Sequence, residues 1–186
     1  MKRVGNVKIF DDFFPSEVHK EVWELMQRPM WGLAGGNPPH TFWHMDGLEK
    51  EEYFNTYLYG LICSNLKRKF DGIVRIYANG QTAGQCGVPH MDDGDITLLY
   101  YPNPEWQLSL QGHLMMCDVP YSMKRFKTTG NRRHTPAKND EILSAIVYKP
   151  NRAVMFPARS YHYADAPDRY FPGLRVSLAY KLLGKL

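Results

Sequence analysis

The sequence is poor in cysteine, in long apolar runs and in net charge, and each shortage excludes a class of protein. Three cysteines, an odd number without a C-x-x-C pair, exclude a disulfide framework and a zinc knuckle, and they predict reduced thiols and a cytoplasmic location. No segment approaches the roughly 18 apolar residues of a membrane-spanning helix, so no membrane contact is expected. The net charge of +4 does not by itself indicate a nucleic-acid partner.

One segment departs from this balance of charge. Between Val119 and Asn139 the chain carries six lysines and arginines, Arg125 among them, and no acidic residue. One interpretation is a solvated loop. The other is a basic flap that meets an acidic substrate or partner, and it makes Arg125 a candidate substrate contact.

The first part of the chain contains two helical patterns. Apolar residues at i, i+4, i+7 and i+8 from Val18 predict an amphipathic helix that is capped by Ser16 and ends near Arg28. A loop rich in glycine and proline, Trp31 to Pro39, follows it. A second helical pattern, with an aromatic stripe that we expect to pack on a sheet, runs from Leu48 to Phe70.

From residue 71 onward the period of the apolar residues changes to two, as in β-strands. Short strands after helices predict a jelly roll or a sandwich with helices on one face, in a single domain. Periodicity alone does not separate a jelly roll from an immunoglobulin-like sandwich. The expected strands are Ile73–Ala78, Ile96–Tyr101, Leu110–Cys117, Ile142–Tyr148, Ala153–Phe156, Ser160–Ala164 and Leu174–Leu183.

The tripeptide His90-Met-Asp92 carries two metal-binding side chains two residues apart, which on a strand lie on the same face. A second copy, His44-Met-Asp46, lies in a predicted loop, whereas the first lies between two predicted strands. His40 and His44 would face one metal on a helix, but the adjoining Pro38-Pro39 argues against a helix there. We therefore expect a substrate-loop or structural role for His44.

Two ligands hold a metal poorly, so a third must come from elsewhere in the chain. His162, on a late β-segment, is the best candidate, although taken alone it also fits a core histidine. Two histidines and one carboxylate leave three adjacent positions of an octahedral metal open. This suits non-haem Fe(II) that binds a cosubstrate and dioxygen together, whereas zinc hydrolysis would need fewer open positions.

Arg175 and Ser177 share one face of a strand within an apolar run. An arginine that faces inward must find an anion. A carboxylate of the protein is one candidate, and a dicarboxylate ligand held by the guanidinium is the functional one. If Arg169 were the anchor instead, the β-pattern around Arg175 would have no explanation.

The order of these parts resembles the Fe(II)/2-oxoglutarate-dependent dioxygenases, and within them the prolyl 4-hydroxylase-like branch. The resemblance covers about Ile73 to Leu183. It implies an α+β, mainly β fold: a double-stranded β-helix (jelly roll) over residues 71–186, with residues 1–70 as a helical support region. The matching pieces are Tyr77 with its glycine-containing loop, His90-Met-Asp92, the run from Ile96 to Asn103, the strand with Gly112, His162 and Arg175-Val-Ser177.

The resemblance also implies cofactors and residue roles. The cofactors would be Fe(II), 2-oxoglutarate and O2. The iron ligands would be His90, Asp92 and His162. The cosubstrate contacts would be Arg175 on the distal carboxylate, Ser177 and Tyr101 beside it, Tyr77, and Leu114 as an apolar wall. For both tyrosines a core aromatic role is the alternative.

The chain departs from the family at Gln111-Gly112-His113, where Gly-Gly-Glu or Gly-Gly-aliphatic is usual, and its spacing from His162 to Arg175 is longer. The implied reaction hydroxylates an unactivated C–H bond and releases succinate and CO2. A prolyl residue in a peptide or protein is the first substrate hypothesis. The candidate substrate contacts are Trp106, His113 and Arg125.

Three alternatives stay open. A free amino acid or another small molecule would serve equally as substrate, since fold and cofactor do not set it. A jelly roll can also hold a metal or a small anion without turnover. A nucleic-acid partner would use the basic segment between Val119 and Asn139, but the sparse aromatic residues there make this partner the least expected. The sequence leaves the oligomeric state open.

Overall fold

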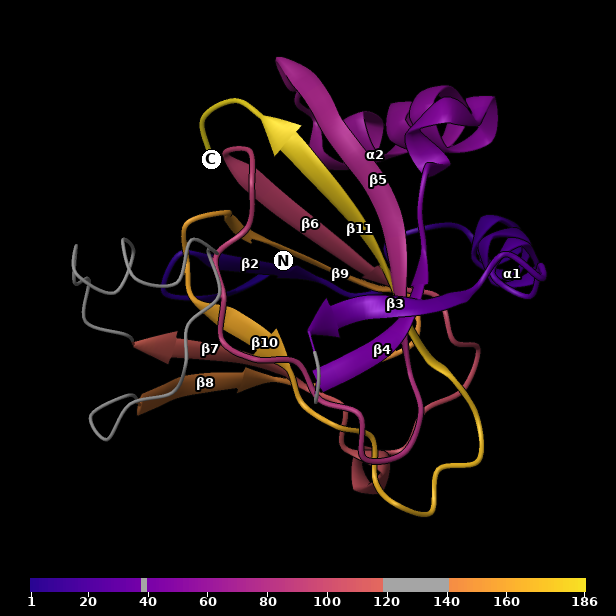
Figure 1. The fold of residues 1–186 in the computed structure, drawn as a ribbon. Coiled ribbons are helices and arrows are strands. Elements are labelled where there is room, and N and C mark those ends of the chain that lie inside the picture. Colours follow the sequence, from indigo (N-terminus) through magenta and orange to yellow (C-terminus); the bar gives the residue numbers. More distant parts are fainter. Residues whose placement is uncertain (38–39, 119–140) are drawn as a thin grey trace.

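Two antiparallel β-sheets form the centre of the protein (Figure 1). The structure is a computed structural model that describes residues 1–37, 40–118 and 141–186. Eight strands form the larger sheet in the order β1-β2-β9-β6-β11-β5-β4-β3, and three form the smaller sheet in the order β10-β7-β8. The strands are β1 (Lys2–Val4), β2 (Val7–Phe10), β3 (Gly32–Asn37), β4 (His40–Met45), β5 (Gly72–Gln81), β6 (Ile96–Tyr101), β7 (Leu114–Asp118), β8 (Glu141–Ile146), β9 (Arg152–Pro157), β10 (His162–Ala164) and β11 (Arg175–Leu183).

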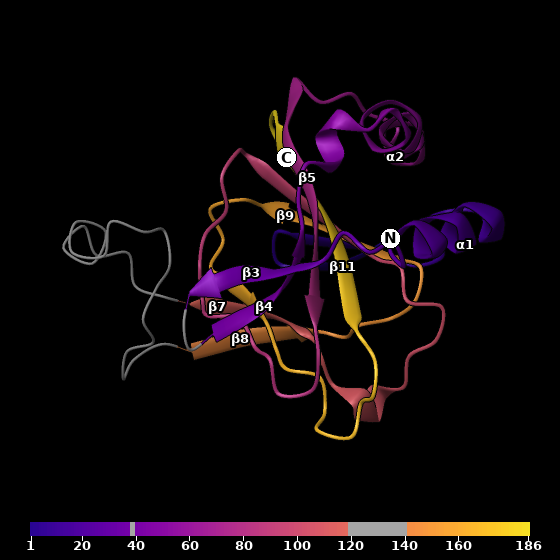
Figure 2. The ribbon, with the colours of Figure 1, turned by 45° about the vertical axis from the view of Figure 1, so that its right-hand side comes forward.

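Helices cover one face of the larger sheet, and the smaller sheet lies on its other side (Figures 1 and 2). The helical elements are α1 (Ser16–Leu25), a 3-10 turn (Leu48–Lys50), a π-helical segment (Tyr53–Leu58), α2 (Tyr59–Leu66) and a second 3-10 turn (Leu108–Leu110). One hydrophobic core fills the space between these helices and the larger sheet. A second core lies between the two sheets. This is the arrangement of helices on one face of a β-sandwich that the sequence predicts.

Strand β11 shows how one strand serves both cores. It pairs with β5 on one side and with β6 on the other, so it is a central strand. Val176, Leu178 and Tyr180 point into the helix-side core. Because side chains alternate along a strand, Arg175 and Lys181 belong to the opposite face, toward the second sheet. This face carries the polar side chains of the candidate site.

All seven strands predicted after residue 71 are confirmed within a few residues at their ends. β6 has the predicted bounds, and β11 begins one residue later than expected. The main difference is at β7, which begins at Leu114, because residues 108–110 form a 3-10 turn and Gln111 and Gly112 both have positive φ angles. The basic segment between Val119 and Asn139, with Arg125, lies outside the described residues.

The prediction that residues 1–70 form a helical support region is wrong in part, because four strands lie in it. β2 pairs with β9, and β4 pairs with β5, so these strands extend the larger sheet at both edges. The segment expected as a loop, Trp31 to Pro39, contributes β3, which pairs with β4 in a hairpin. Backbone pairing of β3 with β4, which itself pairs with β5, overrides the weak β-propensity of glycine here.

The helix predictions are right in position and wrong in detail. The α1 helix occupies the predicted segment, but its N-cap is Pro15 and no side chain caps it. The Ser16 hydroxyl instead donates a hydrogen bond to the Glu17 carboxylate at 3.0 Å. The pattern from Leu48 to Phe70 is broken into three helical pieces and ends where Lys67 adopts a left-handed conformation.

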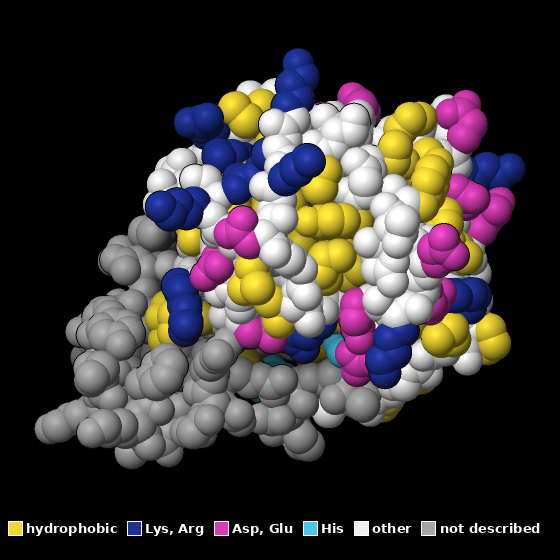
Figure 3. Space-filling model, turned by 90° about the horizontal axis from the view of Figure 1, so that it is seen from above, with side chains coloured by type: hydrophobic (Ala, Val, Ile, Leu, Met, Phe, Trp, Pro, Cys, Tyr) yellow, Lys and Arg dark blue, Asp and Glu magenta, His cyan; other side chains and the backbone are white. Residues whose placement is uncertain are grey.

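The surface seen from above carries both signs of charge (Figure 3). Basic side chains and acidic side chains surround a strip of hydrophobic side chains in this view. In the part of the chain that the structure describes, the longest helices are only a few turns long, and none has the length and apolarity to cross a bilayer.

A hydrogen-bonded chain ties α1 to the larger sheet. His19 Nδ1 lies 2.5 Å from the Tyr100 hydroxyl, and that hydroxyl donates to Asn151 Oδ1 at 3.0 Å. Because the Tyr100 proton is used in this way, His19 Nδ1 must be the donor to the Tyr100 oxygen. The other ring nitrogen, Nε2, is buried without a partner. Burial lowers the pKa of His19, since a proton on Nε2 would bring an unpaired charge into this site.

The first prediction concerns this histidine. The pKa of His19 in the folded chain is lower than the usual 6.5 of the unfolded chain, so the unfolded state binds the proton more readily. The free energy of unfolding should therefore fall as the pH drops below 6.5, and this loss should be complete below the folded pKa. Urea unfolding at pH 7.5 to 5.0 should show a smaller loss for His19→Gln than for wild type. If the free energy of unfolding fell equally with pH in the two proteins, the prediction for His19 would be contradicted.

Candidate metal centre and anion pocket

Backbone hydrogen bonds bring the two halves of the candidate centre together. His90 and His162 form an isolated β-bridge, with both amide-to-carbonyl hydrogen bonds at 3.0 Å. The Asp92 amide donates to the Ala158 carbonyl at 2.8 Å. The segment around His90 is therefore a connection between β5 and β6 that is hydrogen-bonded to β10. His90, Asp92 and His162 offer ligand atoms that all lie within 4.8 Å of one another.

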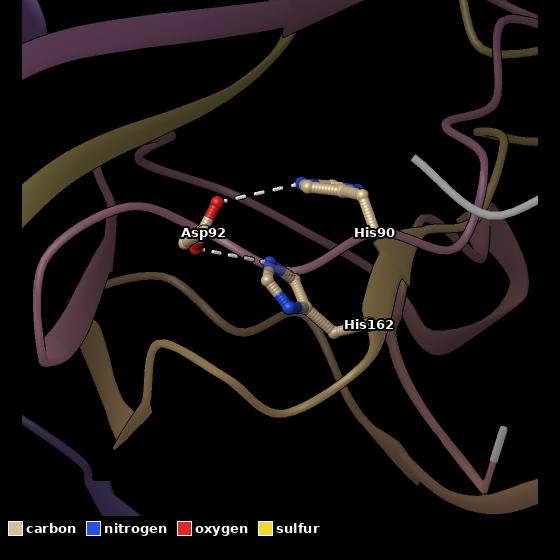
Figure 4. Close-up of side chains that lie close together, drawn as sticks. All are labelled: His90, Asp92 and His162. Atoms are coloured by element: carbon tan, nitrogen blue, oxygen red, sulfur yellow. Dashed lines mark ion pairs between the residues drawn. The ribbon is translucent and has the colours of Figure 1, made fainter. Parts of the chain in front are cut away.

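The two histidine rings are held in the orientation that a metal needs (Figure 4). His90 Nδ1 lies 2.8 Å from the Val88 carbonyl, and His162 Nδ1 lies 2.9 Å from the Ser160 carbonyl. A carbonyl can only accept, so in each ring Nδ1 carries the proton and Nε2 carries the lone pair. Both Nε2 atoms face Asp92, at 3.5 Å from its Oδ1 for His90 and 3.2 Å from its Oδ2 for His162. This is how ligating histidines are fixed in metal sites.

Asp92 is a buried carboxylate with its own counter-charge. The Lys181 ammonium forms a short salt bridge with Asp92 Oδ2, and the Thr97 hydroxyl donates to the same oxygen at 2.6 Å. Burial by itself raises the pKa of Asp92, but the Lys181 charge together with the two histidines outweighs it and holds this pKa well below its usual range. Burial lowers the pKa of His162, which keeps its ring neutral. The centre therefore offers one carboxylate and two imidazole lone pairs.

Arg175 lies at the other end of the same pocket and is 1% exposed. Its Nε donates to the Gly112 carbonyl at 2.7 Å, and one terminal nitrogen donates to Gln81 Oε1 at 3.0 Å. Burial lowers the pKa of Arg175, although the group stays charged. Among the described residues, no carboxylate forms an ion pair with it. A buried guanidinium without a carboxylate partner is stabilised by an anionic ligand.

Aromatic rings and unpaired polar atoms surround this guanidinium. It lies 4.7 Å from the centre of the Tyr148 ring and 5.5 Å from that of Tyr101. The Tyr101 hydroxyl and Asn79 Oδ1 are buried and lack hydrogen-bond partners in the described part of the chain. Buried polar atoms are rarely left unpaired, so each marks a position where a ligand or water can bind.

The structure brings most of the predicted site residues into one pocket of about 510 Å³, counting the part open to solvent. His90 and His162 line it near the metal centre, and Arg175 lines it at the other end. The full lining is Phe42, Tyr77, Asn79, Gln81, Gly87, His90, Leu99, Leu114, His162, Ala164, Arg175, Ser177 and Lys181. Tyr77, Leu114 and Ser177, which the sequence analysis names as cosubstrate contacts, line this pocket, and Tyr101 lies beside Arg175.

Two of the predicted substrate contacts, Trp106 and His113, do not belong to the lining of this pocket. Trp106 packs on Tyr148 and Phe171 behind Arg175, and its indole nitrogen donates to the Gln111 carbonyl at 3.1 Å. His113 Nδ1 accepts from the Tyr148 amide at 3.4 Å, and His113 does not belong to the pocket lining. Both therefore support the wall that holds Arg175. The third candidate, Arg125, lies outside the described residues.

Sequence reasoning missed several residues of the pocket. The missed lining residues include Phe42, Asn79, Gln81 and Lys181, and Tyr148, whose ring lies beside Arg175 outside this lining, was missed as well. A signal for Lys181 was present: it follows Arg175 and Ser177 at an even spacing, so it had to share their buried face. Phe42 lies on β4, a strand that the sequence pattern did not predict.

The second His-x-Asp copy lies partly on a strand, although the sequence predicts a loop there, and the substrate-loop or structural role expected for His44 stays a prediction. His44 lies on β4, and its Nδ1 is 2.8 Å from Asp46 Oδ2. Its ring lies 5.0 Å from that of Tyr77. His40, on the same strand, contacts Cys86 at 3.7 Å between Nδ1 and Sγ. Neither histidine belongs to the group of potential metal ligands found in the described residues.

These residues fit a metal ion and a dicarboxylate. Two neutral imidazoles and one carboxylate on one side of a site form the donor set of non-haem Fe(II) centres with open positions. The buried guanidinium, with the unpaired Tyr101 hydroxyl beside it, fits a carboxylate at the far end of the pocket. The pocket therefore has a place for a metal ion near Lys181 and a place for an anion near Arg175, and both residues belong to β11.

Solved structures with the same fold were found, although no family model and no curated protein matches the sequence. A prolyl hydroxylase from Trichoplax adhaerens, solved with a peptide of hypoxia inducible factor, has a TM-score of 0.66 at 16% identity, over 96% of this chain and 83% of that one. A prolyl-4-hydroxylase from Pseudomonas putida has a TM-score of 0.63 at 15% identity, over 97% and 93%.

A third structure, HygX from Streptomyces hygroscopicus with nickel and 2-oxoglutarate bound, has a TM-score of 0.65 at 8% identity, over 95% of this chain and 82% of that one. At these identities the likeness concerns the fold. The chain has the jelly-roll fold of the prolyl hydroxylases and other 2-oxoglutarate- and Fe(II)-dependent oxygenases, and the fold class expected from the sequence is confirmed.

The second prediction tests the contact that holds Arg175. Gly112 has a φ of +69°, and a Cβ there would lie 3.1 Å from Arg175 Cδ and 3.2 Å from its Nε. Gly84 has a similar φ of +76° but no atom near its Cβ position. Gly84→Ala should lose about 1 kcal/mol from the left-handed backbone alone. Gly112→Ala should lose roughly 1–3 kcal/mol more, because Arg175 and the Trp106 ring, whose Cζ2 would lie 3.2 Å from the new Cβ, must both move. Chemical denaturation measures both, and equal losses would show that Arg175 is not held there.

Proposed function

We propose that this protein is an Fe(II)- and 2-oxoglutarate-dependent dioxygenase that hydroxylates an unactivated C–H bond and releases succinate and CO2. One observation carries the proposal: a His-Asp-His group and a buried arginine without a carboxylate partner among the described residues line the same pocket. Each alone is common in proteins. Together they match the two requirements of the cofactor pair, a three-ligand metal and a dicarboxylate.

The residues divide the work as follows. His90, Asp92 and His162 would hold the metal, and Arg175 would hold the distal carboxylate of 2-oxoglutarate. The bound iron supplies the oxidising chemistry, which couples decarboxylation of the cosubstrate to oxidation of the substrate. Leu99 and Leu114 line the pocket with apolar surface and limit the access of water.

The polar walls orient the cosubstrate in this proposal. Ser177 and the Tyr101 hydroxyl would donate hydrogen bonds to the same carboxylate as Arg175. Tyr77 is buried at the metal end of the pocket, between the guanidinium of Arg75 and the ring of His44. Its ring is thus fixed, and its hydroxyl would contact the cosubstrate close to the metal. No side chain of the protein has to act as a nucleophile.

For the substrate we propose a prolyl residue in a peptide or protein. Two of the solved structures with this fold are prolyl hydroxylases, and one of them was solved with a peptide. In this chain, Phe42 of the β3–β4 hairpin lines the pocket, so an extended hairpin borders the metal centre. A hairpin beside a pocket gives a peptide more contact surface than a small molecule needs. A hydroxylated prolyl peptide, detected by its gain of one oxygen atom, is the expected product.

The alternatives predict other results. A small-molecule oxygenase would consume 2-oxoglutarate with a free amino acid or a similar compound but not with peptides. A binding protein would bind metal without succinate formation. The face in Figure 3 mixes acidic side chains with basic ones, so this face does not favour a nucleic-acid partner.

The third prediction is the direct test of the proposed cofactors. Anaerobic addition of Fe(II) and 2-oxoglutarate should give the weak visible charge-transfer band of the chelate in wild type. His162→Ala should lose the band because the metal loses a ligand. Arg175→Ala should need roughly 30-fold or more 2-oxoglutarate, because the cosubstrate loses its charged partner. Admission of air should then produce succinate, and prolyl peptides should increase its rate.

Matched variants of the two His-x-Asp copies provide the control. His90→Ala should lose the band, whereas His44→Ala should keep it, since His44 pairs with Asp46 and does not face the metal centre. The reverse result would place the metal at His44-Met-Asp46 and contradict its assignment to His90-Met-Asp92. No band in wild type at saturating ligand would leave a jelly-roll binding protein as the better description.

A further inference from the structure

Lys181 is the most unusual residue of the pocket, because a buried lysine touches a candidate metal ligand. Its side chain is 1% exposed. Its ammonium forms the salt bridge with Asp92 Oδ2 and donates to the Thr97 hydroxyl at 3.2 Å, and Thr97 in turn donates to Asp92 Oδ2. The three side chains thus form a closed ring of hydrogen bonds. Thr97 and Lys181 are directly paired in β6 and β11, so the backbone fixes this ring.

The ring occupies only one of the two oxygens of Asp92. A carboxylate oxygen has about two lone-pair positions, and Lys181 and Thr97 fill both on Oδ2. His162 Nε2 lies 3.2 Å from Oδ2 but has no proton to give, since its proton is on Nδ1. Oδ1 accepts no hydrogen bond from the described side chains and faces His90 Nε2 at 3.5 Å. Oδ1 is therefore the oxygen that is free to bind a metal.

We propose that Lys181, together with Thr97, is a positioning residue that keeps Asp92 a one-oxygen ligand through Oδ1. The inference rests on the metal centre of the proposed function. It matters because of the number of open positions on the metal. An octahedral ion with two histidines and one carboxylate oxygen has three positions left, which are needed by a two-oxygen cosubstrate and by dioxygen. A carboxylate bound through both oxygens would occupy one of these three positions and leave none for dioxygen.

The fourth prediction counts these positions with Mn(II) as the probe. The number of water molecules bound to the ion is measured from the relaxation of water protons. Wild type should show about three, and Lys181→Met/Thr97→Val should show about two, a drop of roughly one third. After 2-oxoglutarate is added, wild type should keep about one water and the double variant none. Lys181→Met alone should fall between them, since Thr97 still holds Oδ2.

Tyr180→Phe is the matched control. Tyr180 is the neighbour of Lys181 on β11, it is fully buried, and its hydroxyl donates to the Phe54 carbonyl at 2.9 Å on the helix side of the sheet. The substitution removes a buried hydrogen bond from the same strand without touching the pocket. It should lower the stability but leave the water count at about three. A stability effect alone therefore cannot imitate the expected result.

A second measurement needs no variant. In a crystal structure of the wild-type protein with Co(II), the metal should bind Oδ1 of Asp92 only, and Oδ2 should keep Lys181 and Thr97. A metal on Oδ2, or three waters on Mn(II) in the double variant, would overturn the role of Lys181 and leave the metal centre standing. No binding of Mn(II) or Co(II) to wild type would overturn the metal centre itself, and this role with it.

Discussion

The alternation of side chains along β11 is the constraint on which the site depends. One face of this strand is apolar and packs against the helices, and the other carries Arg175 and Lys181. Both charges are held in the interior by the same backbone, and a buried charge is tolerated only where it is paired. The two cations meet this requirement in opposite ways. Lys181 has its partner in Asp92, whereas Arg175 has only carbonyl oxygens, from Gly112 and Gln81, among the described residues.

This difference separates the pocket into two functions. At the end of the pocket with Lys181 the charges cancel, because the Asp92 carboxylate balances the Lys181 ammonium. A metal can approach Asp92 through Oδ1, the oxygen that Lys181 leaves free. The arginine end keeps a net positive charge in a wall of aromatic rings, where an anion is strongly favoured. A dianion with one carboxylate on the metal and the other on Arg175 would satisfy both ends at once. The chemistry of the pocket thus follows from how each buried charge is compensated.

The sequence predicts the parts of this site that have a regular spacing. His90, Asp92, His162 and Arg175 were identified because they lie on or between segments with a clear period of two, and β6 was predicted with its bounds. The hairpin of β3 and β4 was missed, since its glycines and prolines indicate a loop and only the pairing of β4 with β5 makes it a strand. Lys181 was missed for a different reason. A lysine in a strand is normally exposed, so its even spacing from Arg175 was not interpreted as burial, and the contact with Asp92 shows that it is buried.

The two copies of His-Met-Asp show why a motif alone does not specify a metal site. In His44-Met-Asp46 the histidine uses Nδ1 to pair with the aspartate of its own tripeptide, and that aspartate is mostly exposed. In His90-Met-Asp92 the histidine gives Nδ1 to the Val88 carbonyl, so Nε2 is free. The aspartate there is buried and is held by residues of β6 and β11. The same three residues therefore form a local hydrogen bond in one setting and a candidate ligand set in the other. The surrounding hydrogen bonds, by fixing which atom of each side chain stays available, decide between the two.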